Sequence, residues 1–146
     1  MSFNHLKRLA VTVEMTAEFP LHQLIGEPVL ILAPATSANK DYFNGLLRRS
    51  RKNLRQIQAQ SIDTSLLDEN REDDRILYSK HVVKGWRKIV DDTGSLVELN
   101  EASCLEFLKA LPDWLFDDVR TFASNPRNFL DDLPDEEVTA GNLPQG

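Results

Sequence analysis

The sequence predicts one mainly helical α+β domain over residues 1–130, followed by a flexible acidic tail over residues 131–146. Three observations carry this prediction. Short β-favouring apolar segments lie near the N-terminus, apolar residues recur at helical spacing in about four later segments, and the tail is rich in Asp, Glu, Gly and Pro. With 146 residues, of which 41% are hydrophobic, the chain is long enough for one core. We expect N-terminal strands, a central short hairpin, about four helices and a disordered acidic tail.

Two strands are expected before the first helix. Residues 7–15 alternate between polar and apolar positions, with one side formed by Leu9, Val11, Val13 and Met15. Residues 28–32 form a continuous apolar run bounded by Gly26 and Pro34. We expect the two segments to pair antiparallel, with the second one more deeply buried.

The first long helix is expected to begin after Thr36 or Ser37, either of which is a suitable N-cap. Apolar residues then recur at helical spacing from Tyr42 to Ile57. Gly45 is unfavourable inside a helix by roughly 1 kcal/mol relative to alanine. Either a close contact with another helix or a tolerated defect explains this glycine. The polar face is basic and contains Arg48, Arg49, Arg51, Lys52 and Arg55.

A Gly85-Trp86 corner stands at the centre of the predicted fold. After a connection over residues 58–65, either one helix runs to Val83 or a short helix precedes a better one from Glu72. Gly85 is expected to end this helix, and Trp86 to cover the junction. Residues 89–97 are then expected to form a hairpin around a turn that contains Gly94.

Two further helices are predicted after the hairpin. Asn100 is expected to cap the first, with Ser103 at the N3 position and a buried stripe of Leu105, Leu108 and Leu111. Pro112 ends this helix and starts the next, whose expected inward residues are Trp114, Leu115, Val119 and Phe122. Asp117, Asp118 and Arg120 are expected to point outward. Asn125-Pro126 breaks the chain again, and residues 129–130 are expected to dock back.

Charge is distributed unevenly along the chain. Residues 1–90 contain 14 Lys/Arg and 10 Asp/Glu, a charge of +4, whereas residues 91–146 contain 3 and 13, a charge of −10. This polarity indicates a partner reached through one face, or subunits that meet head to tail; solvated helix faces are the simpler alternative.

No pattern of catalytic residues is present, so the protein is not expected to be an enzyme. His5, His22 and His81 have no companion at metal-ligand spacing, and the glycines do not form a phosphate-binding loop. The acidic pairs, such as Asp117-Asp118, are adjacent in sequence and therefore point apart on a helix. The single cysteine, Cys104, is expected to be a buried small hydrophobe. We expect no cofactor and no metal.

The single cysteine also rules out an intramolecular disulfide, and neither a secretory signal nor an apolar run of about 20 residues is present. A soluble, cytoplasmic protein that does not interact with a membrane is therefore expected.

The basic cluster is the best candidate for an interaction surface. Five positive charges on one helix can contact phosphates, but the acidic domain contains no recognised nucleic-acid-reading module. Nucleic acid is therefore the least favoured partner, an acidic protein surface is favoured over it, and a solvated face is the simplest interpretation. The candidate protein-binding residues are Arg48, Arg49, Arg51, Lys52, Arg55, Asp117 and Asp118.

Three motifs are similar to blocks of the tail assembly chaperones of long-tailed bacteriophages. Residues 31–35, followed by Asn39 and the segments 42–43 and 46–48, resemble an early block with an apolar strand and an Asn-x-x-Tyr helix. Residues 77–94 resemble the block in which a helix and a valine pair precede Gly-Trp and Asp-x-x-Gly. Residues 99–112 resemble the helix that follows. The structural signature is Gly85, Trp86 and Gly94.

This resemblance implies a non-enzymatic function. Such chaperones bind the tape-measure protein, keep its apolar helices in solution, help recruit tail-tube subunits and are absent from the finished virion. Self-association and a location in the bacterial host cytoplasm are further expectations. The alternatives are a small phage structural protein retained in the virion, such as a connector or tail completion protein, and a nucleic-acid-binding regulator that uses residues 48–55.

Overall fold

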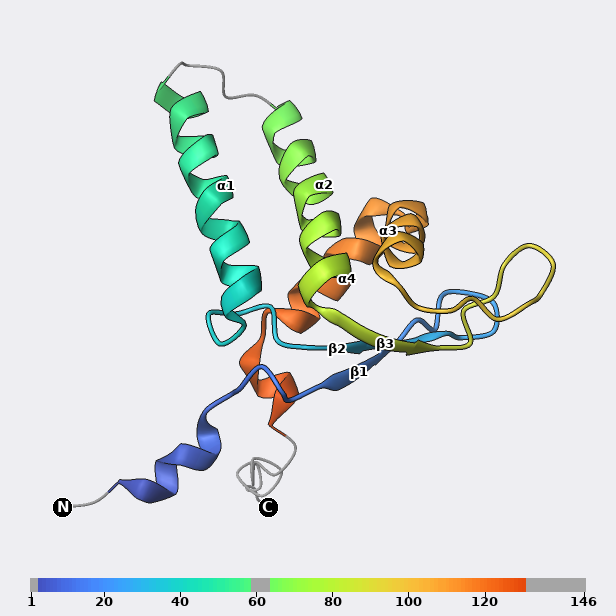
Figure 1. Ribbon diagram of the computed structural model, residues 1–146, viewed down its shortest axis with the longest axis horizontal. Helices are drawn as coiled ribbons and strands as arrows, with labels where there is room; N and C mark the ends of the chain where they lie inside the picture. The colour runs from blue at the N-terminus through green and yellow to red at the C-terminus, as the bar shows by residue number, and fades with distance from the viewer. Residues whose placement is uncertain (1–2, 59–63, 131–146) are drawn as a thin grey trace, which may run out of the picture.

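The computed structural model describes residues 3–58 and 64–130, and the fold is α+β as the sequence predicts. A small antiparallel sheet lies beside four α-helices, and the α1–α2 hairpin extends away from the sheet (Figure 1). In chain order the elements are the 3₁₀-helix η1 (Asn4–Leu9), β1 (Ala17–Pro20), β2 (Val29–Leu32), α1 (Lys40–Gln58), α2 (Thr64–His81), β3 (Val83–Arg87), α3 (Glu101–Ala110), α4 (Asp113–Ala123) and the 3₁₀-helix η2 (Pro126–Phe129). The predicted acidic tail, residues 131–146, lies outside the described residues.

The sheet has the strand order β1-β2-β3, and both neighbouring pairs are antiparallel. Leu30 lies opposite Phe19 on one side and Trp86 on the other. The apolar run at residues 28–32 is thus confirmed as the more buried strand, because it occupies the centre. Pro20 is tolerated in β1 since an edge strand needs no ladder bond from every amide.

The strand predicted over residues 7–15 is wrong. Residues 4–9 form η1, which buries none of its side chains, and the strand that pairs with β2 begins only at Ala17. Leu9 ends η1 and is exposed, whereas Val11, Val13 and Met15 are only half-buried and reach a turn at residues 13–14, so the alternation is not that of a strand. The residues that pair with β2 include Phe19 and Pro20, which lie beyond the predicted strand.

The Gly85 corner is also corrected by the structure. The helix α2 ends at His81, and Gly85 and Trp86 lie within β3. Gly85 does not adopt a positive φ, so it does not act as a helix cap. A side chain there would instead press against β2, because a Cβ atom at Gly85 would lie 3.1 Å from Cδ1 of Ile31. Pairing with β2 overrides the helix-ending signal of this glycine.

The predicted hairpin at residues 89–97 is reduced to a single bridge between Val90 and Leu96. Its turn is confirmed. Gly94 has φ +83°, and Oδ1 of Asp91 accepts hydrogen bonds from the amides of Thr93 (2.9 Å) and Ser95 (3.0 Å).

Asn39, rather than Thr36 or Ser37, caps α1. Its Oδ1 accepts from the amide of Tyr42 at 3.4 Å, and its Nδ2 donates to the carbonyl oxygens of Pro34 (3.1 Å) and His81 (2.8 Å). Thr36 instead accepts from the amide of Ala38 at 3.2 Å. The buried Asn39 side chain therefore ties the start of α1 to the end of α2.

The structure of α1 and α2 decides between two pairs of alternatives that the sequence left open. Residues 64–81 form one continuous helix, so the single-helix interpretation is correct. Gly45 of α1 is buried against the side chain of Leu77, which explains the glycine by a close helix contact.

The core forms where the sheet, α2, α3 and α4 meet. Asn100 caps α3 in a capping box with Ser103, as predicted. Leu108 and Leu111 are buried as expected, while Cys104 takes the buried position that was assigned to Leu105, which is only half-buried.

The inward side of α4 differs from the prediction at two positions, Trp114 and Phe116. Leu115 and Val119 are buried as expected, but Phe116 is fully buried while Trp114 is 56% exposed. The prediction for Trp114 is therefore wrong: the apolar stripe of α4 is rotated so that Phe116 faces Tyr78, with ring centres 5.5 Å apart. Phe129 docks back into the protein as predicted and is 3% exposed.

Candidate protein-binding surface

The helix α1 carries an exposed apolar stripe, which we call the α1 stripe and define as Phe43, Leu47 and Leu54. These side chains are 36%, 42% and 54% exposed. Their spacing of four and seven residues places them on one side of the helix. The stripe is a set of large apolar side chains without a covering element among the described residues.

The inner side of α1 faces α2, which is its main packing partner. Gly45 and Arg49 lie on this inner side, where they contact Leu77 and Asp74 of α2. The α1 stripe lies on another side of the helix, and α1 is the outer helix of the α1–α2 hairpin in the view of Figure 1. Among the described residues, only the inner face of this amphipathic helix is therefore covered by another element.

The predicted basic cluster is divided by the structure. Arg48 and Arg51 are exposed and form no hydrogen bond or ion pair within the described part of the chain. Arg49 is half-buried and points into the fold. The side chains of Lys52 and Arg55 lie outside the described residues. The basic charge flanking the α1 stripe in the described part of the helix thus comes from Arg48 and from Arg51, which follows Leu47 by one turn.

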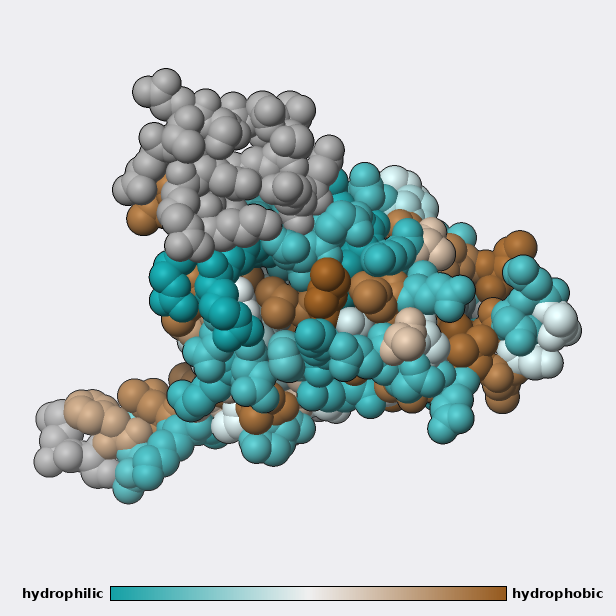
Figure 2. Space-filling model, turned by 45° about the horizontal axis from the view of Figure 1, so that its top comes forward, coloured by the Kyte–Doolittle hydropathy of each residue, from teal (hydrophilic) through white to brown (hydrophobic). Residues whose placement is uncertain are grey.

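A shallow groove of about 240 Å³ separates α1 from α2 on one side of the hairpin, with Ile76 as its exposed apolar residue. In Figure 2, which turns the α1–α2 end forward, apolar side chains gather in the middle of the face and are framed by hydrophilic ones. The residues that line the groove are Gly45, Arg48, Arg49, Asp73, Ile76 and Leu77.

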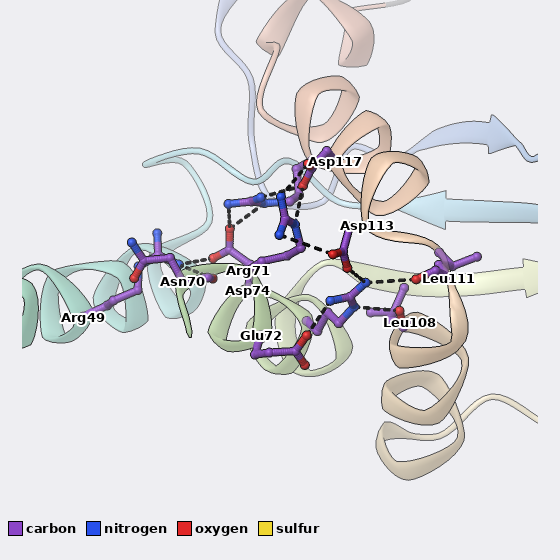
Figure 3. Close-up of polar contacts among 11 residues, drawn as sticks. Arg49, Asn70, Arg71, Glu72, Asp74, Leu108, Leu111, Asp113 and Asp117 are labelled. Atoms are coloured by element: carbon purple, nitrogen blue, oxygen red, sulfur yellow. Dashed lines mark hydrogen bonds and ion pairs between the residues drawn. The ribbon is translucent and has the colours of Figure 1, made fainter. Parts of the chain in front are cut away.

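A buried carboxylate connects three helices. Asp74 of α2 is 3% exposed; its Oδ1 accepts from Nη1 of Arg49, and its Oδ2 accepts from Nε of Arg120 at 2.8 Å (Figure 3). Arg49 also donates to the carbonyl oxygen of Asn70 at 3.2 Å. Because Asp74 is shared between α1 and α4, it fixes the position of α1 relative to the body of the protein.

Asp117, a predicted binding residue, belongs to the same network. Arg71 donates to both of its carboxylate oxygens, from Nε at 3.1 Å and from Nη2 at 3.0 Å, and Arg120 donates from Nη1 at 2.8 Å. The hydrogen bonds from Arg71 hold the pKa of Asp117 below its usual value. Its neighbour Asp118 is exposed and forms no ion pair within the described residues. Of this acidic pair, Asp118 is the one without a partner in the described ranges 3–58 and 64–130.

Arg75 was not singled out by sequence reasoning. It is 2% exposed and donates to the carbonyl oxygens of Leu108 (2.8 Å) and Leu111 (3.0 Å) at the end of α3. It also pairs with Glu72 and Asp113, at 2.6 Å and 3.1 Å. Arg75 lies three residues before Tyr78 and seven residues before Val82, both of which are buried. This helical spacing places Arg75 on the inner face of α2 and is the signal by which the sequence could have identified it.

The structural signature residues stabilise the fold. Nε1 of Trp86 donates to the carbonyl oxygen of Val97 at 2.9 Å, and its ring packs edge-on against Phe107 of α3 with centres 5.6 Å apart. Trp86 therefore joins β3 to α3 and to the segment before it, in agreement with its expected role at a junction. Gly85 and Gly94 serve the sheet and the turn, as described above.

The described residues show neither a metal site nor a reactive cysteine. Residues 3–58 and 64–130 contain no group of three His, Cys, Asp or Glu side chains that is suited to a metal ion. Burial raises the pKa of the Cys104 thiol to about 12, which is unlike a reactive cysteine. None of the described helices combines the length and the apolar character needed to cross a bilayer.

Comparison with known proteins identifies a family for most of the chain. A family model described as the YdaY prophage protein matches residues 37–142, which include α1, the ion-pair network, β3, α3 and α4. No curated protein and no solved structure matches the chain.

Proposed function

We propose that this chain, which belongs to the YdaY prophage protein family and is therefore phage-derived, is a non-enzymatic assembly chaperone of the phage tail. In this role it binds apolar helices of the tape-measure protein and helps recruit tail-tube subunits. The α1 stripe is the observation that carries the proposal. A partner helix that packs along this side of α1 would cover Phe43, Leu47 and Leu54 in the way a neighbouring helix covers a core-facing stripe.

The charges around the stripe define the chemistry of the partner. Arg48 and Arg51 lie beside the apolar side chains and have no ion-pair partner in the described part of the chain. The best partner is therefore an amphipathic helix with acidic residues next to its apolar face. The loss of Arg49 to an internal ion pair with Asp74 weakens the alternative of phosphate binding, because fewer cations remain available.

The ion-pair network supports a preformed binding surface. Asp74 joins Arg49 of α1 to Arg120 of α4, and Asn39 joins the start of α1 to the carbonyl group of His81. These contacts hold α1 in place while its outer side stays exposed. A surface that is already ordered loses less conformational entropy when a partner binds.

Co-expression with the tape-measure protein of the same prophage tests the proposal. The wild-type chain should keep the tape-measure protein in the soluble fraction and copurify with it. Leu47→Asp should abolish this effect, because it places a charge within the α1 stripe. Leu96→Asp is the matched control: Leu96 is 77% exposed but lies in the loop that follows β3, so this variant should behave as wild type. Equal capture by all three proteins would contradict the proposal.

Mass spectrometry of purified virions separates a chaperone from a structural component. A chaperone is expected to be absent from the particle or present only in traces. One copy or more per tail would instead favour the retained structural protein. The recruitment step is tested by adding purified tail-tube protein to the complex, which should bind the complex more tightly than it binds the tape-measure protein alone.

A further inference from the structure

The helix α4 carries a second exposed surface, formed by Trp114 and Asp118, which we call the α4 face. Trp114 is 56% exposed, and Asp118 follows it by one turn on the same side of the helix. Asp118 has no ion-pair partner among the described residues. An exposed tryptophan next to a free carboxylate is a typical anchor for a protein contact, because tryptophan is enriched among the residues that dominate binding energy.

The α4 face and the α1 stripe are complementary. On α1, the exposed Leu47 is followed one turn later by Arg51; on α4, Trp114 is followed one turn later by Asp118, and neither charge has an ion-pair partner among the residues that the structure describes. The two surfaces thus have an apolar residue and a charge at the same spacing, with opposite signs. The same polarity holds for the whole chain, with +4 on residues 1–90 and −10 on residues 91–146.

The two surfaces do not cover each other within one molecule. Leu47 and Trp114 are both exposed in the folded chain. Since α4 is tied to α2 by the Arg71–Asp117 and Arg120–Asp74 pairs, it cannot move to the outer side of α1 without breaking the network. Each surface therefore remains available to another molecule.

We propose that the occupant of the α1 stripe, when no client is bound, is the α4 face of a second copy of this chain. The contact joins two different surfaces, so two copies either satisfy both contacts at once in a two-fold symmetric dimer, or the contact continues from copy to copy until a larger ring closes or a filament grows. The inference rests on the proposed function in one respect, namely that the second copy and the client helix compete for the α1 stripe.

Sedimentation velocity of the full chain over a range of concentrations tests the contact. The wild-type mass should rise above that of a monomer, and the rise should weaken at high salt because Arg51 and Asp118 attract each other across the interface. Trp114→Ala should weaken the association by at least about thirty-fold, the effect expected for a central anchor residue. Glu98→Lys, which reverses an exposed charge outside both surfaces, should leave the association unchanged.

A charge exchange identifies the contacting pair. Arg51→Glu and Asp118→Lys should each weaken the association, and the double variant should restore it, because the pair is re-formed with reversed signs. Circular dichroism confirms that each variant is folded. A chain that is monomeric at all concentrations, or a double variant weaker than both single variants, would overturn the proposal.

Capture of the tape-measure protein by the variants distinguishes a failure of this inference from a failure of the proposed function. Trp114→Ala leaves the α1 stripe intact, so it should capture the tape-measure protein as well as the wild type does, or better. If the chain does not self-associate but still captures the client, only the self-association is refuted. If it self-associates but captures no client, only the chaperone function is refuted.

Discussion

Nε of the buried Arg75 in α2 donates to the carbonyl oxygen of Leu108 in α3 at 2.8 Å. Together with the bond from Nη2 to Leu111, this contact supplies side-chain donors to carbonyl groups at the C-terminal end of α3, where the Leu108 oxygen also accepts from the C-cap amide of Leu111 at 3.3 Å. The guanidinium also lies over the ring of Phe116, 4.8 Å from its centre. A single cation thus connects α2, the end of α3 and the start of α4.

Replacement of Arg75 should be strongly destabilising. Arg75→Met keeps much of the side-chain volume but removes the guanidinium donor to the two buried carbonyl groups and its ion pair with Asp113. We expect a loss of about 3–5 kcal/mol in the free energy of unfolding, as measured by urea denaturation. Arg87→Met is the control, because Arg87 forms an exposed pair with Glu18 and should matter little. Similar midpoints for the two variants would show that the buried contacts do not stabilise the fold.

Asp117 should make the free energy of unfolding depend on pH. The hydrogen bonds from Arg71 lower its pKa in the folded state, so the unfolded chain binds the proton more readily. This contribution is fully present above the unfolded pKa, about 3.9, and is lost as the pH falls through the lower folded value. Urea midpoints measured from pH 6 to pH 3 should therefore decrease less for Asp117→Asn than for the wild type. Parallel curves would contradict this assignment.

Cys104 should be unreactive until the protein unfolds. Its side chain is fully buried, and burial raises its pKa to about 12, so the thiol stays protonated at pH 8. We expect labelling by a thiol reagent at pH 8 to be at least about a hundred-fold slower in the folded protein than in urea. Rapid labelling of the native protein would show that the α3 face carrying Cys104 opens readily.

The two tryptophans should differ in their effect on stability. Trp86→Ala removes the packing against Phe107 and the hydrogen bond to Val97, and we expect a loss of about 3 kcal/mol because the side chain is half-buried. Trp86→Phe should lose only about 1 kcal/mol, since it keeps an aromatic ring. Trp114→Ala is the matched control and should change stability by less than about 0.5 kcal/mol. Denaturation followed by circular dichroism measures all three, and equal losses at both tryptophans would contradict the assigned positions.

Local patterns predicted those parts of the fold in which neighbouring residues determine the outcome. The capping box of Asn100 and Ser103, the turn at Gly94 and the buried run at residues 28–32 were all predicted, because each depends on a few adjacent side chains. The strand at residues 7–15 and the helix end at Gly85 were wrong. In both cases a pairing with β2, which is distant in sequence, determines the structure.

The candidate site shows the same division. Sequence alone located the basic residues of α1 and the acidic residues of α4, but it did not distinguish Arg49 from Arg51 or Asp117 from Asp118. That distinction depends on which side of each helix meets Asp74 and Arg71, and hence on how three helices pack. The sequence by itself determined the fold class, the amphipathic character of α1 and the charge polarity of the chain. Only the tertiary structure decided which charges form ion pairs inside the fold and which have no partner among the described residues, because a charge is neutralised only by a partner that packing brings to it.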